Sequence, residues 1–464
     1  MSSSDSPVAK KGTIHRQWII GFIATITVLT YGLQSGWMSP FIIVLQSENS
    51  PSGYSLSNYE ISWIASGISV LAIISAVIFS YIADAIGRRY TLIMIAIPQI
   101  FGFALKLVSA HPICLFVSQA FCGIAGGGVY CVAPIYIKEI SQDSLRGVLG
   151  SSGILLQSLG ITIMYAMGAY IDYYTVLWIV VWLPILNVVA LFKVPESPAF
   201  LVKKGQFEEA TKVMAWLRGV DIDDKEVERD ISLTKTELAM YENLPSVSFK
   251  SIFTEKSSRR GLGLSFLMII MLDLGGNYAI LAYASVIIRN AGVTIAPDLQ
   301  TILFPALMTI GSLASALTVE KFGRKPLIIL SVIFTGIPLL ILGSAILIQQ
   351  RGGIMPPWLP VLCIGICLFA SGQHMPLPFI VMSEMFSIEL RSKVLGLLVT
   401  FGWLLCAIQT VIFAAVTEYF GMHTLFFFFA FINFIGVIIF WIKMPETKGK
   451  TNAQIDKELE GIRN

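Results

Sequence analysis

The chain has 464 residues, of which 55% are hydrophobic and 13% are charged. Soluble domains carry roughly 45–50% apolar and about 25% charged residues, because their surfaces must meet water. This composition argues against a soluble enzyme and against a nucleic-acid-binding protein, and it predicts a membrane protein. The net charge of +3 indicates no particular partner by itself.

Twelve apolar runs are long enough to cross a bilayer as helices. They lie near residues 18–44, 61–83, 90–109, 112–137, 147–170, 175–193, 260–289, 299–319, 326–349, 357–383, 394–417 and 424–443. Between the sixth and the seventh run the chain becomes charged, and Glu and Lys one turn apart indicate short amphipathic helices of a soluble linker. The predicted organisation is a tail at 1–17, a six-helix bundle at 18–193, the linker at 194–259, a second bundle at 260–443 and a tail at 444–464.

Positive charge is distributed very unevenly along this pattern. Of the 32 Lys and Arg residues, all but Lys106, Arg289 and Arg351 lie in the tails, the linker or the even-numbered loops between spans. Cytoplasmic loops carry the excess of Lys and Arg, so we expect both termini and the linker in the cytoplasm. We interpret Lys106, late in the third span, as reaching out to the membrane interface.

The cysteines do not indicate a disulfide framework or a zinc site. All six fall inside apolar runs, and none has Cys-x-x-Cys spacing. We interpret them as small core residues, and we expect neither a metal nor a cofactor.

Three short charged motifs occur in both halves of the chain, in the same order. Asp-Ala-Ile-Gly-Arg-Arg at 84–89 recurs as Glu-Lys-Phe-Gly-Arg-Lys at 320–325, Glu139 and Arg146 recur with equal spacing as Glu384 and Arg391, and Pro-Glu-Ser at 195–197 recurs as Pro-Glu-Thr at 445–447. This order indicates a duplicated six-helix unit, as in one large class of secondary transporters.

Taken together in register, these motifs resemble the sugar-porter branch of the major facilitator superfamily over nearly the whole chain. The other matching segments are Pro-Ile-Tyr-x-x-Glu at 134–139, Arg-Gly-x-x-Gly at 146–150, Pro-x-Phe-Leu at 198–201 and Glu-x-Phe at 384–386. Within that branch the chain is most similar to the insect facilitated trehalose transporters. The resemblance implies an all-α membrane fold, with twelve transmembrane helices in two pseudo-symmetric bundles and a cytoplasmic helical linker.

The resemblance also implies a gate made by the charged motifs. Carboxylates at fixed distances from arginines are expected to form charge-assisted bonds between the halves at their cytoplasmic ends, and to break when the halves rock. Simple positive-inside charge and helix capping explain only part of the pattern. The expected gating residues are Asp84, Arg88, Arg89, Glu139, Arg146, Glu196, Glu320, Arg324, Glu384, Arg391 and Glu446.

Proton-coupled members of the family pair a buried Asp in the first helix with an Arg in the fourth, and such a carboxylate binds and releases a proton. Here Met38 stands at the Asp position and Gln119 at the Arg position, and neither side chain titrates. We therefore expect facilitated diffusion. Asp273, in the seventh span, is interpreted as a substrate-binding or paired group, with an alternative proton site left open.

A sugar site needs hydrogen-bonding side chains around one or two aromatic planes. At or beside the positions that form the pocket in the family it resembles, this chain carries the residues expected to bind substrate, namely Gln157, Asp273, Asn277, Tyr278, Phe379 and Trp403. Tyr278 and Phe379 fit helix packing equally well. Several polar positions of the family are changed here, so a different sugar, a polyol or a less polar solute stays open.

The resulting interpretation is a facilitative uniporter for a sugar, such as trehalose or a hexose, in the plasma membrane. A proton-coupled symporter and a transport-dead sugar receptor are the alternatives. The sequence contains no motif typical of an enzyme. The expected partners are a small-molecule sugar and the lipid bilayer, with no nucleic acid, and the oligomeric state is left open.

Overall fold

The computed structural model describes residues 14–243, 256–277, 279–281, 297–386, 388–450 and 452–460. Within these residues, twelve helices or helix pairs are long and apolar enough to cross a membrane. The prediction of an all-α, multi-pass membrane fold is therefore confirmed, and each span begins and ends close to its expected position. The predicted end of the seventh span, at 289, lies outside the described residues.

The two halves are built from equivalent sets of helices. The N-terminal half contains α1 (Ile14–Ser35), α2 (Met38–Leu45), α3 (Asn58–Ile86), α4 (Arg88–Val108), α5 (Pro112–Ile140), α6 (Asp143–Tyr170), α7 (Tyr173–Val180) and α8 (Trp182–Lys193). The C-terminal half contains α13 (Lys256–Leu274), α15 (Pro297–Phe322), α16 (Arg324–Gln350), α17 (Trp358–His374), α18 (Leu377–Met385), α19 (Ile388–Phe420) and α20 (Met422–Lys443).

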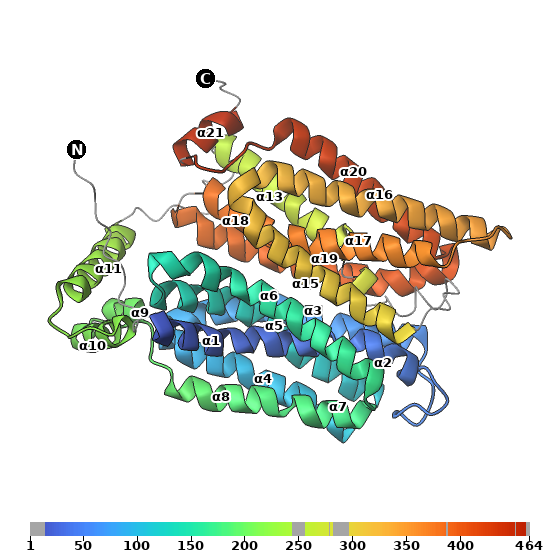
Figure 1. The fold of residues 1–464 in the computed structure, drawn as a ribbon, viewed down its shortest axis with the longest axis horizontal. Coiled ribbons are helices and arrows are strands. Elements are labelled where there is room, and N and C mark those ends of the chain that lie inside the picture. The colour runs from blue at the N-terminus through green and yellow to red at the C-terminus, as the bar shows by residue number, and fades with distance from the viewer. Residues whose placement is uncertain are drawn as a thin grey trace.

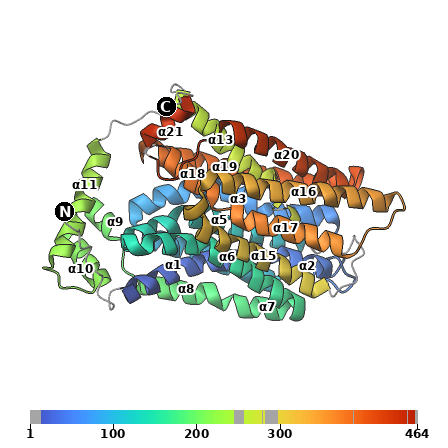
Figure 2. The same ribbon diagram turned by 45° about the horizontal axis from the view of Figure 1, so that its top comes forward.

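The halves lie side by side, as Figures 1 and 2 show. Within the N-terminal half, α3 and α4 pack against α5, and α1 packs against α6. Within the C-terminal half, α16 packs against α20 and α15 against α17. Helices α3 and α19 contact each other across the boundary between the halves, and so do α6 and α15. A space between the halves is therefore bordered by helices of both.

Some spans are interrupted where the local sequence weakens helical hydrogen bonding. The first span breaks at Gly36 and Trp37, between α1 and α2. The tenth span breaks between α17 and α18, where Pro376 and Pro378 lie, because proline has no N–H to donate. Such breaks let the two parts of one span take different directions.

Short helices gather at one end of the bundle, which we call the linker end (Figure 1). They are α9 (Pro198–Lys203), α10 (Phe207–Arg218), α11 (Lys225–Asn243) and α21 (Asn452–Glu460). Helices α9 to α11 share a small apolar core, and Arg16 and Gln17 of α1 donate to the carbonyls of Trp216 and Leu217 at 2.8 and 3.2 Å. Helix α21 packs on α13, so short helices pack against each half at this end.

Candidate functional site: two charged clusters and a central cavity

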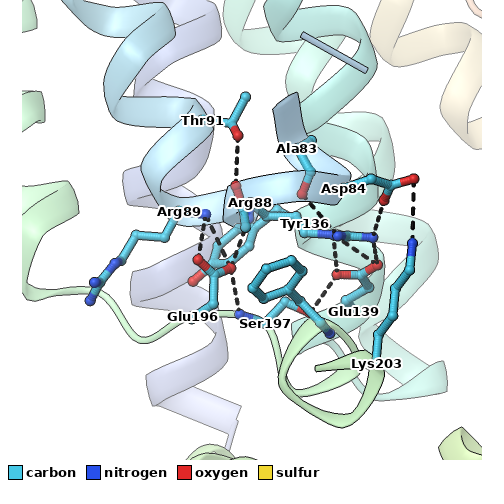
Figure 3. A network of polar contacts seen from close by, with 12 residues as sticks. Ala83, Asp84, Arg88, Arg89, Thr91, Tyr136, Glu139, Glu196, Ser197 and Lys203 are labelled. Atoms are coloured by element: carbon cyan, nitrogen blue, oxygen red, sulfur yellow. Dashed lines mark hydrogen bonds and ion pairs between the residues drawn. The ribbon is translucent and has the colours of Figure 1, made fainter. Parts of the chain in front are cut away.

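Arg88 is the centre of a charged cluster in the N-terminal half, at the linker end (Figure 3). Its Nε lies 3.0 Å from Oε2 of Glu139, and its Nη2 lies 3.2 Å from Oδ1 of Asp84. Its Nη1 donates to the Ala83 carbonyl at 3.0 Å, and the Ser197 hydroxyl donates to Glu139. These contacts join α3, α4, α5 and the segment before α9.

Glu196 completes this cluster by binding the first turn of α4. Its carboxylate accepts from the backbone N–H of Arg88 at 2.8 Å and of Arg89 at 3.2 Å. The first N–H groups of a helix have no partner within it, and the helix dipole favours negative charge there. The turn into α4 passes through Gly87 at φ 107°, and a Cβ there would meet the Glu196 carboxylate.

The C-terminal half repeats this geometry. The Nη2 atom of Arg324 lies 2.8 Å from Oε1 of Glu384 and 2.8 Å from Oε1 of Glu320. Thr447 donates to the other oxygen of Glu384 at 2.6 Å, as Ser197 does to Glu139. The recurring motifs of the sequence thus build equivalent clusters.

Glu446 binds the first turn of α16, as Glu196 binds that of α4. It accepts from the backbone N–H groups of Arg324, Lys325 and Lys448 at 2.9, 3.0 and 3.0 Å. Burial raises the pKa of this carboxyl. These donors and the Thr447 N–H lower the pKa by more, so it lies below its ordinary value.

The structure brings together nine of the eleven expected gating residues, but it does so within each half. No ion pair among the described residues joins the two halves, so the expectation of bonds between the halves is not met by the described side chains. The side chains of Arg146 and Arg391 lie outside the described part of the structure.

A cavity of about 100 Å³ lies between the two halves. None of the described residues that line it is charged. The polar side chains in its wall are Tyr31, Ser35, Ser39, Ser69, Gln119, Gln157, Tyr165, Asn277, Ser371, Trp403 and Thr410. Hydrogen-bonding groups around an apolar space match the chemistry of a small ligand that carries hydroxyl groups.

Three of the six expected substrate-binding residues line this cavity, namely Gln157, Asn277 and Trp403. The structure does not bring Asp273 or Phe379 into the wall. Asp273 is buried, with its carboxylate beside Gly402. Phe379 packs against the apolar core, and Tyr278 lies outside the described residues.

Gln157 is held in place by neighbouring tyrosines. The Tyr130 hydroxyl donates to its Oε1, and the Tyr130 ring meets the Tyr31 ring edge-on at 5.7 Å. Gln119 lines the cavity as well, and neither of its amide atoms has a hydrogen-bond partner among the described residues. Its amide is therefore available to a ligand.

Sequence reasoning missed Tyr31 and Tyr165, which line the cavity from α1 and α6. The Tyr165 hydroxyl donates to the Leu281 carbonyl at 2.6 Å and so connects the two halves. Their position in the middle of an apolar span could have indicated them, because a buried tyrosine hydroxyl needs a hydrogen-bond partner.

The prediction that Lys106 reaches the membrane interface is wrong. This side chain is 0% exposed, and its Nζ lies 4.3 Å from the centroid of the Trp37 ring. The amine points into the N-terminal half because aromatic faces are available to it there.

The chain matches known proteins over almost its whole length. A family model described as "Sugar (and other) transporter" matches residues 20–459. The facilitated trehalose transporter Tret1 of Bombyx mori is 25% identical over 447 residues, covering 96% of this chain and 86% of that protein. Tret1 of Culex quinquefasciatus is 25% identical over 470 residues, covering 99% and 88%.

Among solved structures, the inward open conformation of the xylose transporter XylE from E. coli aligns with a TM-score of 0.77 at 20% identity, covering 97% of this chain and 100% of that one. XylE bound to 6-bromo-6-deoxy-D-glucose aligns with a TM-score of 0.75 at 20% identity and the same coverage. This likeness shows that the fold is shared.

Proposed function

The chain belongs to the sugar (and other) transporter family, and on this basis we propose that it is a uniporter for a sugar such as trehalose or a hexose. The observation that carries the proposal is the uncharged cavity between the two halves. Met38 and Gln119 form part of its wall, so a sugar meets neither a carboxylate nor a cation at the positions where proton-coupled family members carry them.

The substrate is recognised by its hydroxyl groups. The amides of Gln119, Gln157 and Asn277 supply donors and acceptors, and Trp403 supplies an aromatic plane for a sugar ring. A site built in this way discriminates by hydrogen bonds, because a ligand that lacks a hydroxyl leaves a buried polar group without a partner. The named insect relatives favour trehalose as the first sugar to test.

The two arginine-centred clusters serve gating by keeping the helix ends of each half together. Arg88 and Arg324 each bind two carboxylates, and a third carboxylate binds the first turn of the same helix in each half. Each half can then move as one body during alternating access, with the linker end in the cytoplasm. Arg146 and Arg391 belong to the same gate in this proposal.

A proton-coupled symporter is the second candidate, and Asp273 is the observation that favours it. This carboxylate is buried in a membrane span next to Leu272, which lines the cavity. A carboxylate inside a membrane protein is costly and is usually functional.

Uptake of labelled trehalose, glucose, fructose and a polyol into proteoliposomes tests these proposals, with and without a pH gradient. A uniporter gives saturable uptake that stops at equal concentrations on the two sides, in the wild type and in Asp273→Asn alike. Uphill accumulation that Asp273→Asn abolishes would establish the symporter. Binding of a sugar without flux would establish a receptor.

A further inference from the structure

Lys106 is a charged residue that is buried in the N-terminal half and that the proposed transport cycle does not use. It lies in the last turn of α4, far from the Arg88 cluster at the first turn of the same helix. Its side chain is 0% exposed, and Nζ has no hydrogen-bond acceptor among the described residues. A buried ammonium without partners is costly, so its surroundings must compensate for the lost water.

Aromatic rings provide that compensation. Nζ lies 4.3 Å from the centroid of Trp37 and 5.6 Å from that of Phe103. Both distances fall within the range at which an ammonium is attracted to a ring face, and the attraction is strongest for tryptophan and for desolvated pairs. The principal side-chain partner of Lys106 is therefore the Trp37 ring.

Trp37 occupies the break between α1 and α2. Its backbone N–H makes only a long bond, of 3.4 Å, to the Gln34 carbonyl, so the local backbone does not hold it firmly. Its ring is 0% exposed and meets the rings of Phe41 at 5.8 Å and Tyr173 at 6.0 Å. The Tyr173 hydroxyl also contacts the carbonyl of Lys106, at 3.4 Å, so α4 approaches this aromatic group through both backbone and side chain.

The residues on either side of Trp37 form part of the sugar cavity. Ser35 ends α1, Met38 and Ser39 begin α2, and all three line the cavity wall. The orientation of this wall depends on how the chain turns at Trp37. A contact that fixes the Trp37 ring therefore fixes the position of the wall.

We propose that Lys106 is a positioning residue for the substrate cavity, whose ammonium on the face of Trp37 fixes the break between α1 and α2. This inference rests on the proposed function, because Lys106 affects transport only if the wall that it positions binds the sugar. Lys106 itself does not line the cavity.

Sugar uptake by reconstituted Lys106→Met, which keeps most of the length of the side chain and removes its charge, tests the proposal. The KM for the transported sugar rises about tenfold while kcat changes less, because the cavity wall is displaced but the moving halves are intact. The melting temperature does not fall, because methionine needs no compensation for lost water. A lower melting temperature with an unchanged KM would show a structural role only and overturn the proposal.

Trp37→Leu provides the matched partner variant. If Lys106 acts through the Trp37 ring, Lys106→Met added to Trp37→Leu raises KM no further, whereas independent roles give additive effects. Lys235→Met is the control, because Lys235 lies 3.9 Å from the Phe207 ring in the exposed linker. We expect its KM to equal that of the wild type.

A labelling experiment tests the role of Lys106 without measuring transport. Met38→Cys is introduced with and without Lys106→Met, and its reaction with a maleimide is followed in purified protein after subtraction of the native cysteines. Met38 is 3% exposed, so the thiol reacts slowly while the break is fixed. Lys106→Met accelerates the reaction several-fold, and Lys235→Met does not. An unchanged rate overturns the inference, whereas the absence of any sugar uptake by the wild type overturns the proposed function alone.

Discussion

Arg88 and Glu139 make the same contact as Arg324 and Glu384. In each pair, Nε and Nη2 of the arginine both donate to one carboxylate oxygen, at 3.2 and 3.0 Å in the first pair and 3.1 and 2.8 Å in the second. A hydroxyl donates to the other oxygen of each carboxylate, from Ser197 in the first half and from Thr447 in the second. Because the two halves hold these groups so similarly, equivalent substitutions should have equivalent effects.

Glu139→Ala should therefore cut sugar uptake strongly, and Glu384→Ala should cut it by a similar factor. Each change leaves a buried guanidinium short of a carboxylate, and a charge-assisted hydrogen bond contributes about 1.5–3 kcal/mol. Uptake is measured per molecule of protein at the cell surface, and Glu208→Ala, in the exposed first turn of α10, is the control. Normal uptake by Glu139→Ala at normal surface amounts would exclude a gating role for the Arg88 cluster.

Gly323→Ala should destabilise the protein more than Gly205→Ala does. Both glycines have positive φ, at 89° and 75°, which strains an L-residue. Gly323 also has ψ 173°, a combination that is essentially restricted to glycine and costs another residue about 1–3 kcal/mol. A Cβ at Gly205 would meet nothing within 4 Å, whereas one at Gly323 would lie 2.7 Å from Oε2 of Glu446. Thermal unfolding in detergent compares the two variants, and the glycine-only backbone together with the displacement of Glu446 should lower the melting temperature of Gly323→Ala further. Equal melting temperatures for the two variants would contradict this account.

The twelve spans could be predicted because hydropathy depends on the chain alone. The contacts of Arg88 could not, because they depend on which helix ends meet. Glu139 and Glu196 lie 51 and 108 residues further along the chain, and both reach the first turn of α4. The sequence carries the same motif in each half, but equal motifs do not tell whether the bonds form within a half or between halves.

Side-chain direction inside the bundle was predictable only in part. Gln157 was found because a polar side chain in an apolar span usually faces the protein interior. The rule that a lysine near the end of a span reaches water failed for Lys106, because the Trp37 ring lies within its reach inside the bundle. Tyr31 resembles a packing residue in sequence, and only its neighbours show that it borders the cavity.

Glu446→Gln should remove a contribution to stability that depends on pH. The pKa of Glu446 is lower in the folded protein than in the unfolded chain, so its ionised form stabilises the fold. This contribution is complete above the unfolded pKa, near the ordinary glutamate value of 4.5, and is lost as the pH falls through the lower folded value. The melting temperatures of wild type and Glu446→Gln should therefore differ at pH 7 and converge in acid. A difference that is constant from pH 7 to pH 3 would contradict the prediction.

Gln157→Leu should raise the KM for the transported sugar several-fold, whereas Phe379→Leu should leave it nearly unchanged. Leucine keeps most of the volume of Gln157 but cannot bind a sugar hydroxyl, and a lost hydrogen bond costs about 0.5–1.5 kcal/mol. Phe379 packs against the apolar core and is not among the residues that line the cavity. Initial rates of sugar uptake over a range of concentrations give both KM values. If Phe379→Leu raised KM as much as Gln157→Leu, the sugar would bind elsewhere than in the cavity lined by Gln157, Asn277 and Trp403.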